Sequence, residues 1–260
     1  GGSVLWTLGA AAIASALVPL WSYVLLRWRL NPANAAAIAA CYGSISAVTF
    51  ITAISFLELA ELPYSGYMVA AMALMESPAI IVGVLLARWA GAGNNGAGWR
   101  SLVHEAVCNG AVLLLIGSLV IGYLSGEPGW EALAPLVKAP FKGLLCLFLL
   151  DMGLIAAKRM GDLRESGAFL VSFSLVMPVL HAGLGIRTAA GLGLAEGDAL
   201  LLAVLFGSAS YIAVPAAMRI ALPAANPSLY LPMSLGLTFA LNITIGIPLY
   251  LAVIQWGWSS

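Results

Sequence analysis

The segment Tyr42-Gly43-Ser44-Ile45-Ser46-Ala47 returns later in the chain as Phe206-Gly207-Ser208-Ala209-Ser210-Tyr211. The two copies are separated by 164 residues (208 minus 44), and the same offset aligns Pro63 with Pro227. In each copy, one glycine and two serines lie in the middle of an otherwise apolar segment. The repeat therefore predicts two equivalent helices, each interrupted near its centre.

The composition of the chain is that of a membrane protein. Apolar residues make up 62% of the sequence and charged residues 8%, and the mean hydropathy is +1.01. Soluble domains carry roughly 25% charged residues, and a soluble fold could not cover so much apolar surface. The net charge of zero gives no indication of nucleic-acid binding. The cysteines lack the spacing of a metal site, so we expect no cofactor and no metal beyond a coupling ion.

Hydrophobicity divides the chain into about eight predicted membrane spans, because roughly 20 apolar residues cross a bilayer. The approximate spans are 4–26, 33–57, 66–88, 102–124, 139–157, 167–186, 198–222 and 229–256. Short polar stretches separate them, and 158–165 is predicted to be one of the turns. The predicted fold class is an all-α polytopic membrane protein.

The position of the two motifs predicts an inverted repeat. The later motif span follows three predicted spans and precedes one, which defines a five-helix unit. A unit with an odd number of helices enters the membrane from the opposite side at its second occurrence, so the interrupted helices should cross as antiparallel partners in a 5+5 fold. We expect residues 1–90 to form the first half without its first two helices, which is about 60 residues. Residues 91–101 would be a cytoplasmic linker, and residues 102–260 the second half.

The basic residues predict the orientation in the membrane. Most lie on one side of the predicted topology, namely Arg27, Arg29, Arg88, Arg100, Lys158, Arg159, Arg164 and Arg219. The other side has only Lys138, Lys142 and Arg187. Because cytoplasmic loops are enriched in Lys and Arg, the first side should be cytoplasmic. The chain is then a multi-pass protein of the inner (plasma) membrane with its C-terminus outside.

The motif has the chemistry of an ion site. An interrupted helix leaves free N–H groups at the start of its second half, and these favour an anion. Freed carbonyls and serine hydroxyls are hard oxygen ligands that suit sodium. Glycine and serine also occur where membrane helices simply pack closely. The symmetric repetition of the motif favours a solute site, and thus transport.

Other polar residues inside the predicted spans are functional candidates by default. Glu76 precedes Ser77-Pro78, where we expect a further helix interruption, and it could bind sodium or pair with freed backbone donors. Thr238 and Asn242 lie in the corresponding helix of the second half. Asp151 and His181 could form a proton relay or only satisfy local contacts.

Several motifs in order resemble the sodium-dependent bicarbonate permeases first described in cyanobacteria. They are the first interrupted segment and the stretches Met75-Glu76-Ser77-Pro78-Ala79, Phe141-Lys142-Gly143-Leu144-Leu145, Ala224-Ala225-Asn226-Pro227-Ser228 and Gly246-Ile247-Pro248-Leu249. The resemblance covers nearly the whole chain. It implies ten helices in two inverted repeats, a homotrimer, and bicarbonate and sodium bound between the interrupted helices.

The resemblance also implies site residues. The expected substrate-binding positions are Gly43, Ser44, Ser46, Gly207, Ser208, Ser210 and Tyr211, and the expected sodium ligands are Ser44, Ser46, Thr49, Glu76, Ser208, Thr238 and Asn242. The well-known cyanobacterial members carry an acidic residue where this chain has Tyr211. The replacement of the carboxylate by tyrosine removes a hard ligand for sodium. The family also has a long loop that contacts a PII-like regulatory protein, whereas the stretch 91–98 here is short.

The predicted function is therefore sodium-coupled symport of bicarbonate by alternating access. The first alternative is a permease or channel for another small anion or a carboxylate. A remote alternative is an intramembrane hydrolase that pairs a Gly-x-Ser serine with His181. The chain lacks the Gly-x-Ser-x-Gly elbow typical of such enzymes, so we expect no enzymatic activity.

Overall fold

The computed structural model describes residues 2–91 and 110–258, and in these residues all elements are helical. The helices are α1 (Gly2–Leu26), α2 (Pro32–Gly43), α3 (Ala47–Leu59), α4 (Tyr67–Trp89), α6 (Gly110–Gly191), α7 (Glu196–Gly207), α8 (Ala213–Ala221), α9 (Pro227–Leu231), the π-helical segments η1 (Pro232–Phe239) and η2 (Asn242–Gly246), and α10 (Ile247–Trp258). Apart from Gly91, the predicted linker 91–101 lies outside the described residues.

The predicted all-α membrane fold is confirmed. Within the described ranges, five helical stretches are long and apolar enough to cross a membrane: Gly2–Leu26, Pro32–Leu59, Tyr67–Trp89, Gly167–Gly191 and Pro227–Trp258. The predicted span 198–222 is divided between α7 and α8, which are each too short to cross alone. The predicted span 139–157 contains the shorter apolar stretch Gly143–Ile155. The predicted span 102–124 begins outside the described residues.

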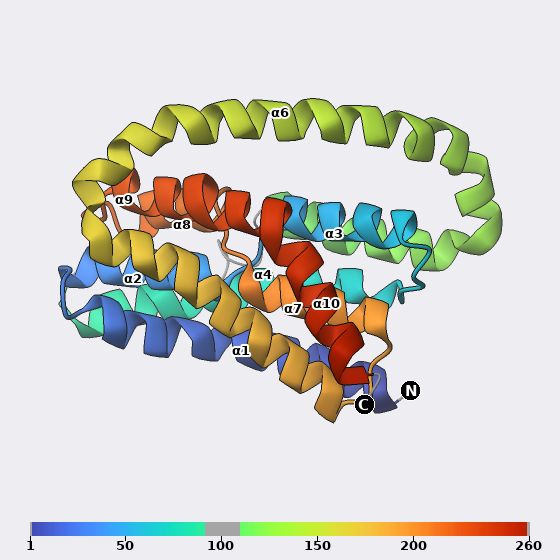
Figure 1. Ribbon diagram of the computed structural model, residues 1–260, viewed down its shortest axis with the longest axis horizontal. Helices are drawn as coiled ribbons and strands as arrows, with labels where there is room; N and C mark the ends of the chain where they lie inside the picture. Colours follow the sequence, from blue (N-terminus) through green and yellow to red (C-terminus); the bar gives the residue numbers. More distant parts are fainter. Residues whose placement is uncertain (1, 92–109, 259–260) are drawn as a thin grey trace.

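The stretch α6 contains the described parts of three predicted spans as helices joined at kinks, and it doubles back along the molecule (Figure 1). It has non-helical backbone angles at Gly126 (φ 58°) and Gly167 (φ 77°). The predicted turn at 158–165 is wrong, because these residues are helical and the non-helical residue is Gly167. A positive φ is readily adopted only by glycine, which explains why the helix deviates there and not at the charged residues before it.

Both predicted interruptions are present at the motif. Helix α2 ends at Gly43 and α3 begins at Ala47, while α7 ends at Gly207 and α8 begins at Ala213. The residue after each glycine, Ser44 or Ser208, has extended backbone angles. The Oγ atom of Ser46 then caps α3 by accepting a hydrogen bond from Thr49 N. The local chemistry of the motif thus ends one half-helix and starts the next.

The two motif glycines are also points of close helix packing. A Cβ atom at Gly43 would collide with Pro19 of α1, and one at Gly207 would lie 2.8 Å from the carbonyl oxygen of Pro178 in α6. In each half, therefore, the helix before the interrupted one packs against the motif glycine. A larger residue at either position would push these helices apart.

The interrupted helices are antiparallel, because α2 packs on α8 and α3 packs on α7. Two side chains at the same offset of 164 residues (198 minus 34), Asn34 and Asp198, join the ends of the pair. Asn34 Oδ1 accepts a hydrogen bond of 2.7 Å from Asn226 N, beyond the end of α8. Asp198 Oδ1 accepts one of 2.6 Å from Ser65 N, beyond the end of α3. We call these contacts the Asn34 clasp and the Asp198 clasp.

The helix that follows the first interrupted helix differs from the prediction. Helix α4 continues through Pro78, so the predicted interruption after Glu76 is wrong. Membrane helices tolerate proline when neighbouring groups satisfy the freed backbone. The second-half counterpart contains the π-helical segments η1 and η2, each with wider turns than an α-helix.

Helices α2 and α7 occupy the centre of the molecule. Every residue in 35–46 and in 197–211 is buried. The outer helices α1 and α6 instead expose large apolar side chains, including Trp6, Ile13 and Leu144. This distribution is expected when lipid, and not water, surrounds the protein. The two motifs therefore lie in the interior, between helices that face the bilayer.

Candidate functional site

The two interruptions meet and are joined by hydrogen bonds. Ser46 N donates to Ser208 Oγ at 3.0 Å, which links the first interruption to the second. Ser210 N donates to the carbonyl oxygen of Cys41 at 2.8 Å, which links the second interruption to the end of α2. The two interruptions, which the repeat predicts to be equivalent, are thus bonded directly to each other.

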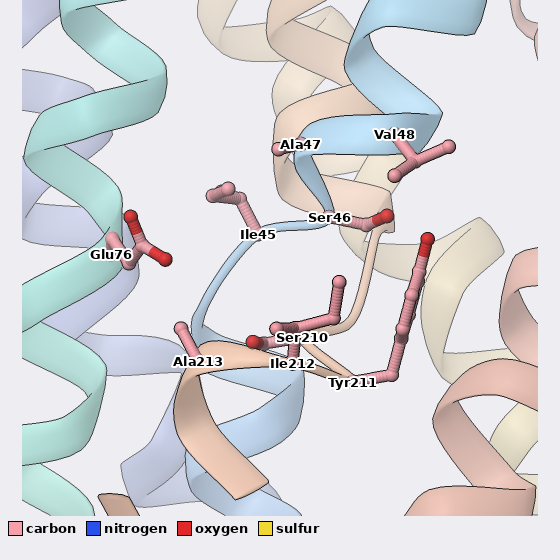
Figure 2. A pocket seen from close by; sticks show the side chains of 9 residues that line it. All are labelled: Ile45, Ser46, Ala47, Val48, Glu76, Ser210, Tyr211, Ile212 and Ala213. Atoms are coloured by element: carbon pink, nitrogen blue, oxygen red, sulfur yellow. The ribbon is translucent and has the colours of Figure 1, made fainter. Parts of the chain in front are cut away.

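A pocket of about 100 Å³ lies at this crossing (Figure 2). Its lining consists of the stretch Ile45–Val48, the stretch Ser210–Ala213, and Glu76 from α4. The first residues of α3 and α8 both belong to this lining, and helix N-termini carry a partial positive charge. Since one water occupies about 30 Å³ in the liquid, the pocket has room for a small ion of a few heavy atoms.

Four of the predicted site residues line the pocket: Ser46, Ser210, Tyr211 and Glu76. Ser46 Oγ accepts hydrogen bonds from Thr49 N at 3.2 Å and from Thr49 Oγ1 at 2.8 Å. Ser210 Oγ accepts one from Val214 N at 3.2 Å. Each serine uses its oxygen to hold the start of a half-helix, so its hydroxyl hydrogen is left to donate elsewhere.

Other predicted residues lie beside the pocket and shape the interruptions. Gly43 and Gly207 are the last residues of α2 and α7. Ser208 Oγ donates to Leu205 O at 3.1 Å while it accepts from Ser46 N. Ser44 Oγ makes a longer bond of 3.5 Å to the carbonyl oxygen of Glu76. Thr49 contributes through its bonds to Ser46 and does not line the pocket.

Thr238 and Asn242 have their oxygens engaged away from the pocket. Thr238 Oγ1 lies 2.8 Å from Tyr42 Oη and donates to Ser174 O at 2.9 Å. Asn242 Nδ2 donates to Gly207 O at 2.9 Å, and Asn242 Oδ1 accepts from Tyr250 Oη at 2.9 Å. Asn242 therefore covers the last carbonyl of α7 and supports the second interruption from behind.

Two polar atoms of the pocket residues have no hydrogen-bond partner. They are the hydroxyl of Tyr211, a residue 7% exposed, and Oε2 of Glu76, a residue 5% exposed. Buried polar atoms are nearly always paired, and an orphan costs about 1–3 kcal/mol. These two groups therefore keep hydrogen-bonding capacity at the pocket.

Five residues that line the pocket could not be predicted from the chemistry of their side chains. Ile45, Ala47, Val48, Ile212 and Ala213 carry no polar side-chain atom, yet they line the pocket. The only signal for them in the sequence is their position directly after the Gly-Ser motif. The carbonyl of Cys41 is a similar case, since its partner became known only from the crossing of the two segments.

The remaining intramembrane candidates do not join the site. His181 is buried and accepts a hydrogen bond from Trp21 Nε1 on its Nε2 atom at 3.0 Å, whereas Asp151 is exposed. Neither lines the pocket. In the part of the chain that the structure describes, no group of three His, Cys, Asp or Glu side chains could hold a metal ion.

Apolar helices long enough to cross a membrane, together with two interrupted helices that cross at a small pocket, are typical of a multi-pass protein of the solute-transporter class. The chain belongs to the Na+-dependent bicarbonate transporter superfamily, whose family model matches residues 1–255. The resemblance found in the sequence is thereby confirmed. No curated protein matches the chain. Because the family is one of transporters, the hydrolase alternative loses its support.

Proposed function

We propose that this chain carries bicarbonate across the membrane together with sodium, and that the pocket at the crossing is the shared site. The observation that supports this most directly is the meeting of two helix N-termini at one small pocket. Family membership supplies the choice of solutes, since the family is described as Na+-dependent bicarbonate transporters.

The proposed anion site uses partial charges instead of basic side chains. No Lys, Arg or His is among the residues that line the pocket. The starts of α3 and α8 supply the positive potential, and the hydroxyls of Ser46, Ser210 and Tyr211 supply hydrogen-bond donors. Such a site holds a monovalent anion without trapping it by a full opposite charge, which suits a protein that must release its solute.

The proposed sodium site is centred on Glu76. Its Oε2 atom has no partner, and a carboxylate is a hard ligand suited to sodium. Ser44 Oγ lies close to the backbone of the same residue, at 3.5 Å from its carbonyl oxygen. Ser46, Thr49 and Ser208 form the neighbouring group of hydroxyls. Thr238 and Asn242 would have to exchange their present hydrogen bonds before they could bind sodium.

The proposed transport cycle is a rocking motion between the crossed helices and the surrounding bundle. The crossed helices are held together at their centre by the Ser46–Ser208 and Ser210–Cys41 bonds. They are held at their ends by the Asn34 and Asp198 clasps. These contacts favour movement of the crossed pair as one body, which would open the pocket to each side in turn.

Uptake into proteoliposomes tests the proposal. Labelled bicarbonate is added with and without an inward sodium gradient, and protein-free liposomes serve as the control. We expect saturable uptake that depends on the sodium gradient. Sodium-independent uptake that does not saturate would instead indicate a channel. Sodium-driven uptake of formate or nitrate, with no bicarbonate uptake, would assign another small anion.

Glu76→Gln tests the cation site in the same assay. The amide keeps the shape of the side chain but removes its charge. We expect the sodium concentration for half-maximal uptake to rise at least tenfold, because a hard ligand is lost. An unchanged sodium dependence would remove Glu76 from the site.

A further inference from the structure

The two halves of the pocket are related by the repeat but are chemically different. At the offset of 164 residues, Tyr211 corresponds to Ala47 (211 minus 47), so the aromatic hydroxyl is present in one half only. An acidic residue is likewise present in one half only, because Glu76 lies in α4 while the counterpart helical stretch Pro227–Trp258 has no acidic residue. The sequence therefore gives the start of α3 and the start of α8 different surroundings.

Two hydroxyl groups, those of Ser46 and Tyr211, lie near the start of α3. Figure 2 shows the Tyr211 side chain rising beside Ser46 and Val48, with its hydroxyl at that end of the pocket. The ring is packed edge-on against Phe239, with ring centroids 5.3 Å apart, so its direction is fixed. The hydroxyl is buried beside Ser46 and makes no hydrogen bond of ordinary length, and Ser46 already accepts two hydrogen bonds. Both O–H groups are left as donors next to a positive helix terminus.

A carboxyl group lies on the opposite side of the pocket. Figure 2 shows Glu76 across the pocket from Tyr211, facing Ile45, on helix α4, which also packs on α8. An acidic side chain is the favoured neighbour of a helix N-terminus, and it disfavours a second negative charge at the same place. Glu76 thus makes its side of the pocket unfavourable for an anion.

We propose that the transported anion binds on one side of the crossing only, at the start of α3, with the hydroxyls of Tyr211 and Ser46 as its side-chain donors. The cation then binds at the Glu76 carboxylate, while the start of α8 adds only its more distant positive potential to the anion site. This assignment rests on the proposed function and adds to it a separate subsite for each ion. It makes Tyr211 the residue that determines the affinity for the anion.

Tyr211→Phe tests the assignment because it removes only the hydroxyl. The purified protein is heated in detergent with bicarbonate, with sodium, or with neither, and its melting temperature is measured. We expect the bicarbonate concentration needed for stabilisation to rise about ten- to hundredfold, as for a lost hydrogen bond to a charged group. The stabilisation by sodium alone should stay the same. The unliganded variant should melt no lower than the parent, since an unpaired buried hydroxyl is lost.

Tyr230→Phe is the matched control. Tyr230 is 1% exposed, its hydroxyl also makes no hydrogen bond of ordinary length, and it does not line the pocket. We expect this variant to bind bicarbonate like the parent. If Tyr211→Phe does not fold, Tyr211→Met repeats the test with another apolar side chain.

The outcomes separate the two proposals. Parent-like bicarbonate stabilisation in Tyr211→Phe overturns the subsite assignment, even if the parent transports bicarbonate. Equal losses in Tyr211→Phe and Tyr230→Phe overturn it as well, because the effect would then be general. If the parent is stabilised by another anion and not by bicarbonate, the proposed solute is wrong, and the same variants tested with that anion decide the subsite.

Discussion

The four serines of the two motifs have three different tasks. Ser46 and Ser210 hold the starts of α3 and α8 through Thr49 N and Val214 N. Ser208 connects the two interruptions by accepting from Ser46 N, and it also donates to Leu205 O. Ser44 makes only the 3.5 Å bond to Glu76 O. The repeat predicts equal roles for Ser44 and Ser208, but their hydrogen bonds are unequal.

This difference predicts that Ser208→Ala is more harmful than Ser44→Ala. Loss of Ser208 Oγ leaves Ser46 N without its acceptor, and an unsatisfied buried donor costs about 1–3 kcal/mol. Loss of Ser44 Oγ removes a weak bond and should cost about 0.5 kcal/mol or less. Thermal unfolding of both variants, followed by bicarbonate uptake, measures the difference. Equal destabilisation would contradict the bridging role of Ser208.

The motif glycines predict a second effect of single residues. Gly43→Ala and Gly207→Ala each place a Cβ against Pro19 or the Pro178 carbonyl, and overpacking of this kind costs about 1–3 kcal/mol. Gly9→Ala is the control, because nothing lies within 4 Å of a Cβ at that position of α1. Alanine there should stabilise the helix by up to about 1 kcal/mol. The melting temperature should therefore fall for Gly43→Ala and Gly207→Ala and rise for Gly9→Ala. A fall for Gly9→Ala would show that α1 does not tolerate even this substitution.

At the scale of helices, the two clasps have the same position but different strengths. Asn34 offers one acceptor at an exposed site, to Asn226 N. Asp198 is buried and accepts three hydrogen bonds, from Ser65 N, Ser65 Oγ and Tyr67 Oη. Hydrogen bonds to a charged acceptor are roughly twice as strong as neutral ones. The crossed pair is therefore held more firmly where α7 begins than where α2 begins.

We expect Asp198→Ala to lower the free energy of unfolding by about 2–4 kcal/mol and Asn34→Ala by about 1 kcal/mol or less. Asp198→Asn should fall between them, since it keeps acceptor geometry and loses the charge. Denaturation of the purified variants provides the measurement. Similar losses for the two alanine variants would mean that the charge of Asp198 adds nothing to the clasp.

The sequence allowed correct prediction of those helices whose signal is local. Apolar length identified the five spans found in the described residues, and the Gly-Ser motif located both interruptions, because glycine packing and serine capping act within a few residues. Proline was misleading at Pro78, because the surroundings of α4 satisfy its backbone. Of the candidate site, Ser46, Ser210, Tyr211 and Glu76 were predictable as residue types. The contact of Asn242 with Gly207 O depends on tertiary packing and could not be predicted.

For the whole molecule, the ends of the helices separate the charges. Helices α1, α4 and α8 finish on the side where α2 begins, and arginines follow or end these helices at Arg27, Arg88 and Arg219 (Figure 1). The loop after α3, on the opposite side, carries Glu61. The distribution supports the predicted orientation, with the arginine side in the cytoplasm.

Single cysteines test this orientation in intact cells. In a background without Cys41, Cys108 and Cys146, we expect Glu61→Cys to react with a membrane-impermeant thiol reagent and Arg29→Cys to react only after the cells are opened. Both native residues are exposed, so accessibility does not limit the reaction. The reverse pattern would place the C-terminus in the cytoplasm.

The π-helical segments η1 and η2 affect how the halves can be compared. A π-turn holds one residue more than an α-turn. A helix that contains π-turns therefore has more residues than an α-helix whose two ends lie at the same places. From Pro232 onward, an alignment of the two halves at a fixed spacing must lose its register, although Pro63 and Pro227 still match before that point. A residue added to or removed from this helix can therefore be accommodated as the gain or loss of a π-turn, with the ends of the helix left in place.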